Sequence, residues 1–192
     1  AIALHGITSS HMAWELLANQ LAGSIDLIAP DLRGRGGSQH LPPPFGLEAH
    51  AQDVVRIAEY LELQHALILG HSLGAYIAIE YAAQFPDQAD RLVLIDGGPG
   101  LPAPVGVAPE DFLKLVLGPA LARLQQTFAS NAAYFEFWRQ HPALAEDWSD
   151  YIEQYLVYDL GGKPPELTPR ICEDAVLTDG KGPISPQAHE RI

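Results

Sequence analysis

The sequence has little cysteine, little methionine and few basic residues. Cys172 is the only cysteine, so an intrachain disulfide is excluded, and no cysteine and histidine spacing resembles a zinc site. We therefore expect no metal and no other cofactor. Lysine and arginine number 11 against 24 acidic residues, a formal net charge of −13. Such a charge repels phosphate backbones and anionic lipid surfaces, which argues against nucleic acid or a membrane as a partner.

Long hydrophobic runs are also missing. Although 47% of the residues are hydrophobic, no run approaches the roughly 20 residues that a membrane-spanning helix needs. The chain has no starting methionine, basic leader or cleavage pattern, and its first residues, AIALHG, are already strand-like. We expect one compact, soluble domain whose first residues already belong to a strand of the fold, and the cytoplasm is the default location. A homo-oligomer is compatible with these features.

The first half of the chain alternates between apolar runs and helical patterns. Four short runs, at residues 1–4, 27–29, 66–69 and 92–95, lack the alternation of half-exposed strands and are predicted to be parallel strands buried on both faces. Helical spacing covers residues 47–61 and 73–85, and Pro86 ends the second helix. Strands that alternate with helices predict an α/β fold with a parallel sheet and right-handed crossovers.

The composition and the hydrophobic pattern change after Gly97. A turn-rich linker, GGPGLPAPVGVAP, precedes three helical segments at about residues 109–128, 131–140 and 147–158, and Ser130 is a good N-cap for the second. Ten of the 16 aromatic residues lie in this half, which predicts a small helical subdomain with an aromatic interior. The tail from Gly161 onward is rich in proline and glycine, and we expect only weak structure there.

One short motif predicts a nucleophilic serine. The stretch GHSLG, residues 70–74, matches G-x-S-x-G, with a strand-like run before it and a helical pattern after it. So tight a turn forces Ser72 into an unfavourable backbone conformation and needs glycine on both sides, because side chains there would collide. The turn exposes the serine Oγ and aims the N–H of Leu73 at the oxyanion that forms when Ser72 attacks a carbonyl. A chance match in a loop is the alternative, which this context disfavours.

Two further segments follow predicted strands. In LHGIT, His5 and Gly6 let the chain turn, which leaves the N–H of Ile7 as a second oxyanion donor. We interpret His5 as a residue that hydrogen-bonds this loop rather than as a catalytic base. In PDLRGRGGS, Arg33 and Arg35 could bind an anion together with the glycine amides. The segment fits neither phosphate-binding glycine motif, so a structural turn is favoured.

Taken together, LHG, PDLRGRGGS, GHSLG and RLVLIDGG resemble the α/β-hydrolase family, in that family's order, over roughly residues 1–98. The resemblance is best to the esterase, haloperoxidase and C–C hydrolase group. It implies a doubly wound, mostly parallel core at residues 1–98, without the two N-terminal strands, and a helical cap with a tail at 99–192. Epoxide hydrolases and haloalkane dehalogenases resemble the pattern too but carry aspartate at the elbow, whereas Ser72 implies acyl chemistry.

The family order also requires an acid and then a histidine after the serine. Asp96, at the end of the strand after the elbow helix, is a candidate acid, with a structural role as the favoured alternative. His141 suits a helix end on the cap surface, and His189 lacks a preceding strand. Because removing the histidine of such a triad lowers turnover by about a million-fold, we expect the intact protein to continue past Ile192 with at least two more strands.

These observations favour a serine hydrolase without a cofactor, a carboxylesterase that acts on a small or medium apolar ester through an acyl-enzyme on Ser72. Lactone hydrolysis, perhydrolysis and cleavage of a C–C bond next to a ketone would use the same machinery, and the sequence does not separate them because selectivity lies in the packing of the cap. The alternative from another class is a hydrolase-like module that binds a ligand without catalysis. The missing base motivates it.

Overall fold

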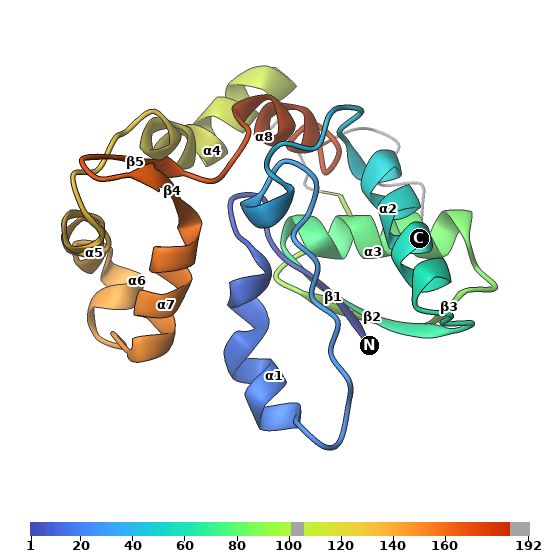
Figure 1. Ribbon diagram of the computed structural model, residues 1–192. Helices are drawn as coiled ribbons and strands as arrows, with labels where there is room; N and C mark the ends of the chain where they lie inside the picture. Colours follow the sequence, from blue (N-terminus) through green and yellow to red (C-terminus); the bar gives the residue numbers. More distant parts are fainter. Residues whose placement is uncertain (101–105, 185–192) are drawn as a thin grey trace.

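The computed structural model describes residues 1–100 and 106–184 (Figure 1). Its main sheet has three parallel strands in the order β1-β2-β3: β1 (Ile2–Leu4), β2 (Ala66–His71) and β3 (Ala89–Ile95). On the other side of β1, Ile28 forms a single parallel bridge with Ile2. All four predicted strand segments therefore join one parallel sheet, although the segment at 27–29 is only a bridge. The predicted α/β fold is confirmed.

Helices cover both faces of this sheet (Figure 1). The two predicted crossover helices are α2 (Leu47–Tyr60) and α3 (Leu73–Gln84), which share a core with alternate residues of β1 and β2. The opposite face carries Trp14, which packs with Ala3 and Leu69. This residue belongs to a short segment that the sequence did not reveal, a 3-10 turn (His11–Trp14) followed by α1 (Glu15–Leu21). None of the described helices is long and apolar enough to span a bilayer.

Strand β3 corrects one expectation. Within the described residues it pairs only with β2, and Val93, Leu94 and Ile95 are 38% to 42% exposed. The prediction that residues 92–95 are buried on both faces is therefore wrong for this part of the chain. An apolar run indicates that both faces of a strand can be buried, but it does not indicate which elements cover those faces.

The second half forms a separate group of helices (Figure 1): α4 (Pro109–Leu124), α5 (Asn131–Arg139), α6 (Pro142–Ala145) and α7 (Asp150–Asp159). The Ser130 hydroxyl accepts a hydrogen bond from the Ala133 amide at 3.2 Å, so its predicted role as the N-cap of α5 is confirmed. Aromatic rings fill the interior, with Phe128 and Tyr134 buried at its centre. The prediction of helices around an aromatic interior holds.

The prediction of weak structure in the tail is wrong for residues 161–179, and residues 185–192 of the tail lie outside the described residues. Strands β4 (Leu160–Lys163) and β5 (Glu166–Pro169) form an antiparallel hairpin, and α8 (Glu173–Asp179) follows. Pro164 and Pro165 make the hairpin turn, and Gly162, with a φ of 92°, lies within β4 opposite Leu167. Leu160 and Leu167 are buried among the aromatic residues, and Val176 of α8 packs against α4. The hairpin is a sheet of its own, so it adds no strand to the main sheet.

Candidate active site

Ser72 occupies the turn between β2 and α3. Its backbone has φ 51° and ψ −118°, a left-handed conformation that side chains rarely adopt. A Cβ on Gly70 would lie 2.3 Å from the carbonyl oxygen of Gly74, and a Cβ on Gly74 would lie 2.0 Å from that of Leu4. Both glycines are therefore required by the close passage of the backbone. The strained strand-to-helix turn predicted from GHSLG is present.

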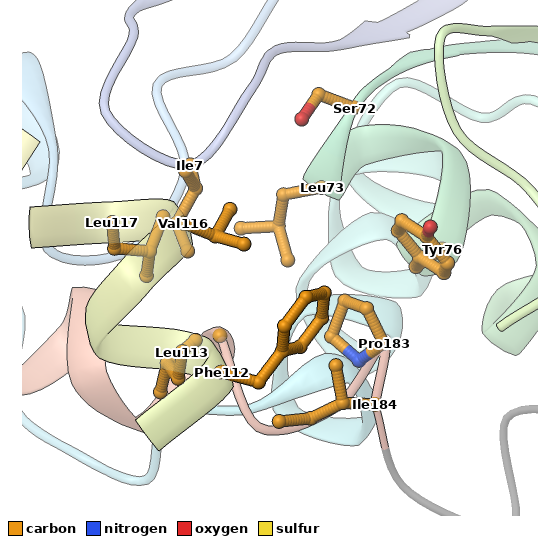
Figure 2. A pocket seen from close by; sticks show the side chains of 11 residues that line it. Ile7, Ser72, Leu73, Tyr76, Phe112, Leu113, Val116, Leu117, Pro183 and Ile184 are labelled. Atoms are coloured by element: carbon orange, nitrogen blue, oxygen red, sulfur yellow. The ribbon is translucent and has the colours of Figure 1, made fainter. Parts of the chain in front are cut away.

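The Ser72 hydroxyl faces a pocket, not the core (Figure 2). The pocket has a volume of about 80 Å³, and the side chains of Ile7 and Leu73 flank the serine in its wall. A Cβ placed on Gly6 would lie 3.5 Å from the Ser72 Cβ, so the loop after β1 packs directly against the elbow. The structure thus brings together Ile7, Ser72 and Leu73, the three residues of the predicted nucleophile and oxyanion hole. Their chemical roles stay predictions.

His5 fixes the orientation of the peptide that carries the Ile7 amide. Its Nε2 accepts a hydrogen bond from the Leu32 N–H at 3.0 Å, so the ring proton is on Nδ1, which lies 2.8 Å from the Gly6 carbonyl oxygen. The ring is 0% exposed, and burial lowers the pKa of His5 from 6.5 to about 3. Because Gly6 C=O and Ile7 N–H belong to one peptide, this neutral histidine aligns the predicted oxyanion donor. Its interpretation as a loop residue agrees with these contacts.

A buried ion pair holds the same loop from the other side. Arg35 Nε donates to the Ile7 carbonyl oxygen at 2.9 Å, and Arg35 Nη1 donates to the carboxylate of Asp179. Asp179 also accepts from His50 Nε2 at 2.9 Å and from the Gly46 N–H at 2.6 Å. Burial alone would raise the pKa of Asp179, but the His50 hydrogen bond and the charge of Arg35 hold it below its usual value. Sequence reasoning missed this cluster.

The favoured interpretation of PDLRGRGGS as a structural turn agrees with the contacts of its arginines. While Arg35 holds Asp179, Arg33 binds Asp53 through two hydrogen bonds of 2.7 and 2.9 Å. Both guanidinium groups are engaged with carboxylates of the chain itself. The segment therefore builds the fold around the site and offers no evident anion site.

Helices of the second half attach to the residues that follow Ile7. Arg123 of α4 is buried against Asp159 at 2.7 Å, and its second amino group donates to the Thr8 carbonyl oxygen at 3.4 Å. The hydroxyl of Tyr155 in α7 donates to Ser9 Oγ at 3.2 Å, and burial raises the pKa of Tyr155 to about 12. The loop from Gly6 to Ser9 is thus held both by the sheet domain and by the helical group.

The described residues do not identify the catalytic acid or the catalytic base. Asp96 follows β3 in a left-handed conformation (φ 49°) and is exposed. The Ser72 N–H donates to the carbonyl oxygen of Ile95 at 2.9 Å, so the end of β3 lies beside the elbow. Within residues 1–100 and 106–184, no histidine ring hydrogen-bonds to Ser72 or to Asp96. His141 is exposed just before α6, as expected for a helix end, and His189 lies outside the described residues.

Known proteins are similar to this chain in both sequence and structure. The N-formylmaleamate deformylase of Pseudomonas putida is 41% identical over 103 residues, which are 52% of this chain and 38% of that enzyme. Lipase LipV of Mycobacterium tuberculosis is 33% identical over 95 residues, 50% of this chain and 36% of the lipase. The chain therefore spans little more than a third of the length of these curated relatives.

Among solved structures, E-2-(acetamidomethylene)succinate hydrolase superposes with a TM-score of 0.77 at 25% sequence identity, covering 96% of this chain and 65% of that one. A marine microorganism esterase has the same fold, with a TM-score of 0.73 at 20% identity and coverage of 96% and 69%. The sequence model of the α/β hydrolase fold matches residues 2–154. This match covers most of the chain, which therefore belongs to the α/β hydrolase fold family.

Proposed function

We propose that the protein is a serine hydrolase that cleaves a small or medium carboxylic ester through an acyl-enzyme on Ser72. The observation that carries this proposal is the strained Ser72, whose hydroxyl faces an apolar pocket between Ile7 and Leu73 at the N-terminus of α3. The lipase and the deformylase among its relatives are hydrolases by name, which supports hydrolytic chemistry here. Serine rather than aspartate at the elbow favours attack on a carbonyl.

The mechanism follows from these positions. Ser72 Oγ forms a bond to the ester carbonyl carbon while its proton passes to a general base. The carbonyl oxygen becomes an oxyanion, which accepts hydrogen bonds from the amides of Ile7 and Leu73. When the tetrahedral intermediate collapses, the C–O bond to the alcohol breaks and the base returns the proton to the leaving alkoxide. A water molecule, deprotonated by the same base, then attacks the acyl-enzyme; the bond from the acyl carbon to Ser72 Oγ breaks, the base returns the proton to Oγ, and the acid is released.

We place the base outside the described residues, on strands that pair with the free edge of β3. The apolar side chains of Val93, Leu94 and Ile95 are exposed along this strand, as expected where further strands and helices pack. The carboxyl ends of parallel strands meet at one edge of a sheet, so residues that follow such strands would lie near Ser72. The acid is either on one of these strands or is Asp96 at the end of β3.

A fluorophosphonate probe tests the nucleophile in the intact protein. We expect the probe to label Ser72 and p-nitrophenyl butyrate to be hydrolysed, and Ser72→Ala to abolish both. Ser24→Ala, a change at an exposed serine, is the matched control and should leave both unchanged. Lactone, peracid and vinylogous diketone substrates, assayed side by side with the ester, separate the related chemistries.

No histidine ring hydrogen-bonds to Ser72 within the described residues, and this favours one second candidate, a module that binds a ligand without catalysis. An intact protein that binds p-nitrophenyl butyrate without hydrolysing it, and that the probe does not label, would support this candidate and overturn the hydrolase.

A further inference from the structure

We propose that the pocket beside Ser72 selects the acyl part of the substrate, and that it admits an uncharged chain of about two to four carbons. This inference rests on the proposed function and adds to it the substrate class. The pocket volume is about 80 Å³, roughly half of the cavity of about 150 Å³ that takes up a benzene molecule. A short acyl chain fills such a space, whereas a longer chain must either extend through the open side of the pocket or displace its walls.

The walls of the pocket are apolar. Helix α4 contributes Phe112, Leu113 and Leu117 on one side, and the segment after α8 contributes Pro183 and Ile184 on the other (Figure 2). No charged side chain is among the lining residues in the described part of the chain. The pocket therefore stabilises hydrocarbon through burial, and its described lining offers no side chain of opposite charge to a charged acyl group.

The depth of the pocket is fixed where α8 meets α4. A Cβ on Gly180 would lie 2.6 Å from Leu113 Cδ1 and 3.0 Å from Leu117 Cδ1, so the two segments are already in close contact. The preceding residue is Asp179, whose buried carboxylate is bound by Arg35 and His50. Because this cluster anchors the end of α8 to the core, the far wall has little freedom to move away from a longer acyl chain.

The pocket should also disfavour an acyl chain that carries a charge. The two buried arginines around the site, Arg35 and Arg123, are each paired with a buried carboxylate, Asp179 and Asp159. A carboxylate at the end of an acyl chain would lose its hydration in this pocket without gaining a cationic partner. We therefore expect the pocket to discriminate between a methyl and a carboxylate at the same position.

A panel of p-nitrophenyl esters tests both limits, because the alcohol stays constant while the acyl group varies. We expect kcat/KM to fall at least tenfold from butyrate to octanoate, since each misplaced methylene group lowers it several-fold or more. The hemisuccinate has the four carbons of butyrate with a terminal carboxylate, and it should react at least a hundredfold more slowly. Phe112→Ala should raise the octanoate to butyrate ratio about tenfold by opening the pocket.

Leu115→Ala is the matched control, because Leu115 lies on the same helix, is 75% exposed and does not line the pocket. It should leave the chain-length profile unchanged. If the fluorophosphonate labels Ser72 but wild-type kcat/KM is flat from acetate to octanoate, or hemisuccinate matches butyrate, the size and charge limits are refuted while the serine hydrolase stands. If Ser72 is not labelled, the proposed function and this inference fail together.

Discussion

Mild acid should destabilise the protein through His5. The ring is fully buried, it donates to Gly6 and accepts from Leu32, and no site is left for a second proton. In the unfolded chain the histidine has its ordinary pKa of about 6.5, whereas in the folded protein the pKa is about 3. Between these values the unfolded state binds more protons than the folded state, so the free energy of unfolding falls as the pH falls.

The size of this effect follows from the two pKa values. His5 contributes fully above pH 6.5, and its contribution decreases by up to about 1.4 kcal/mol for each pH unit below that. From pH 7.5 to pH 5.0 the loss amounts to about 2 kcal/mol. The lowered pKa of Asp179 acts in the same direction, but only below about pH 4, where the carboxylate of the unfolded chain begins to take up a proton while that of the folded protein is still ionised. The interval from pH 7.5 to 5.0 therefore separates the two residues.

Urea unfolding of the intact protein, followed by tryptophan fluorescence at pH 7.5 and 5.0, measures this loss. His5→Asn should be less stable at pH 7.5, yet its free energy of unfolding should fall by about 2 kcal/mol less than that of the wild type. The control is His40→Asn, which changes an exposed histidine and should keep the wild-type dependence on pH. Equal losses in the wild type and in His5→Asn would refute the reasoning.

Two further predictions concern the fold around the site. Arg35→Met leaves the buried Asp179 carboxylate without its arginine partner and should lower the free energy of unfolding by about 3 to 5 kcal/mol. Arg33→Met removes one member of a partly exposed ion pair and should lower the free energy of unfolding by about 1 kcal/mol or less. If urea unfolding gives similar values for the two variants, the assignment of Arg35 to a buried ion pair is contradicted. Gly74→Ala places a Cβ 2.0 Å from a carbonyl oxygen and should prevent folding or lower the melting temperature strongly, while Gly118→Ala, in open space on α4, should raise it slightly. A Gly74→Ala protein as stable as the wild type would show that the elbow is looser than described.

The elbow could be predicted from sequence because its determinants are local. Five consecutive residues, an apolar run before them and a helical pattern after them specify the turn, and the collision that requires Gly70 arises from the nearby backbone of Gly74 and Ala75. The collision that requires Gly74 is with the Leu4 carbonyl of β1, which the sequence alone does not show. Ile7 could be predicted beside Ser72 because LHGIT directly follows the first predicted strand and Gly6 lets the chain turn there. The catalytic roles of these residues stay predictions.

What the sequence did not reveal depends on distant partners. Asp179 meets Arg35 and His50 across 144 and 129 residues, and nothing in its own neighbourhood marks it as a buried anion. The hairpin of β4 and β5 is hidden in the sequence because glycine and proline are typical of loops, although here Pro164 and Pro165 form its turn and Gly161 and Gly162 pair within β4. In both cases, tertiary packing decides the structure and local composition does not.

The outer edge of β3, which has no partner strand among the described residues, has a consequence for the behaviour of this chain in solution. Its outer row of backbone amides and carbonyls is unpaired within the described residues, and apolar side chains flank it. Such an edge is a template on which a strand from another molecule can add, and repetition of that step leads to aggregation. The chain should therefore self-associate through β3, and Val93→Lys should improve its solubility.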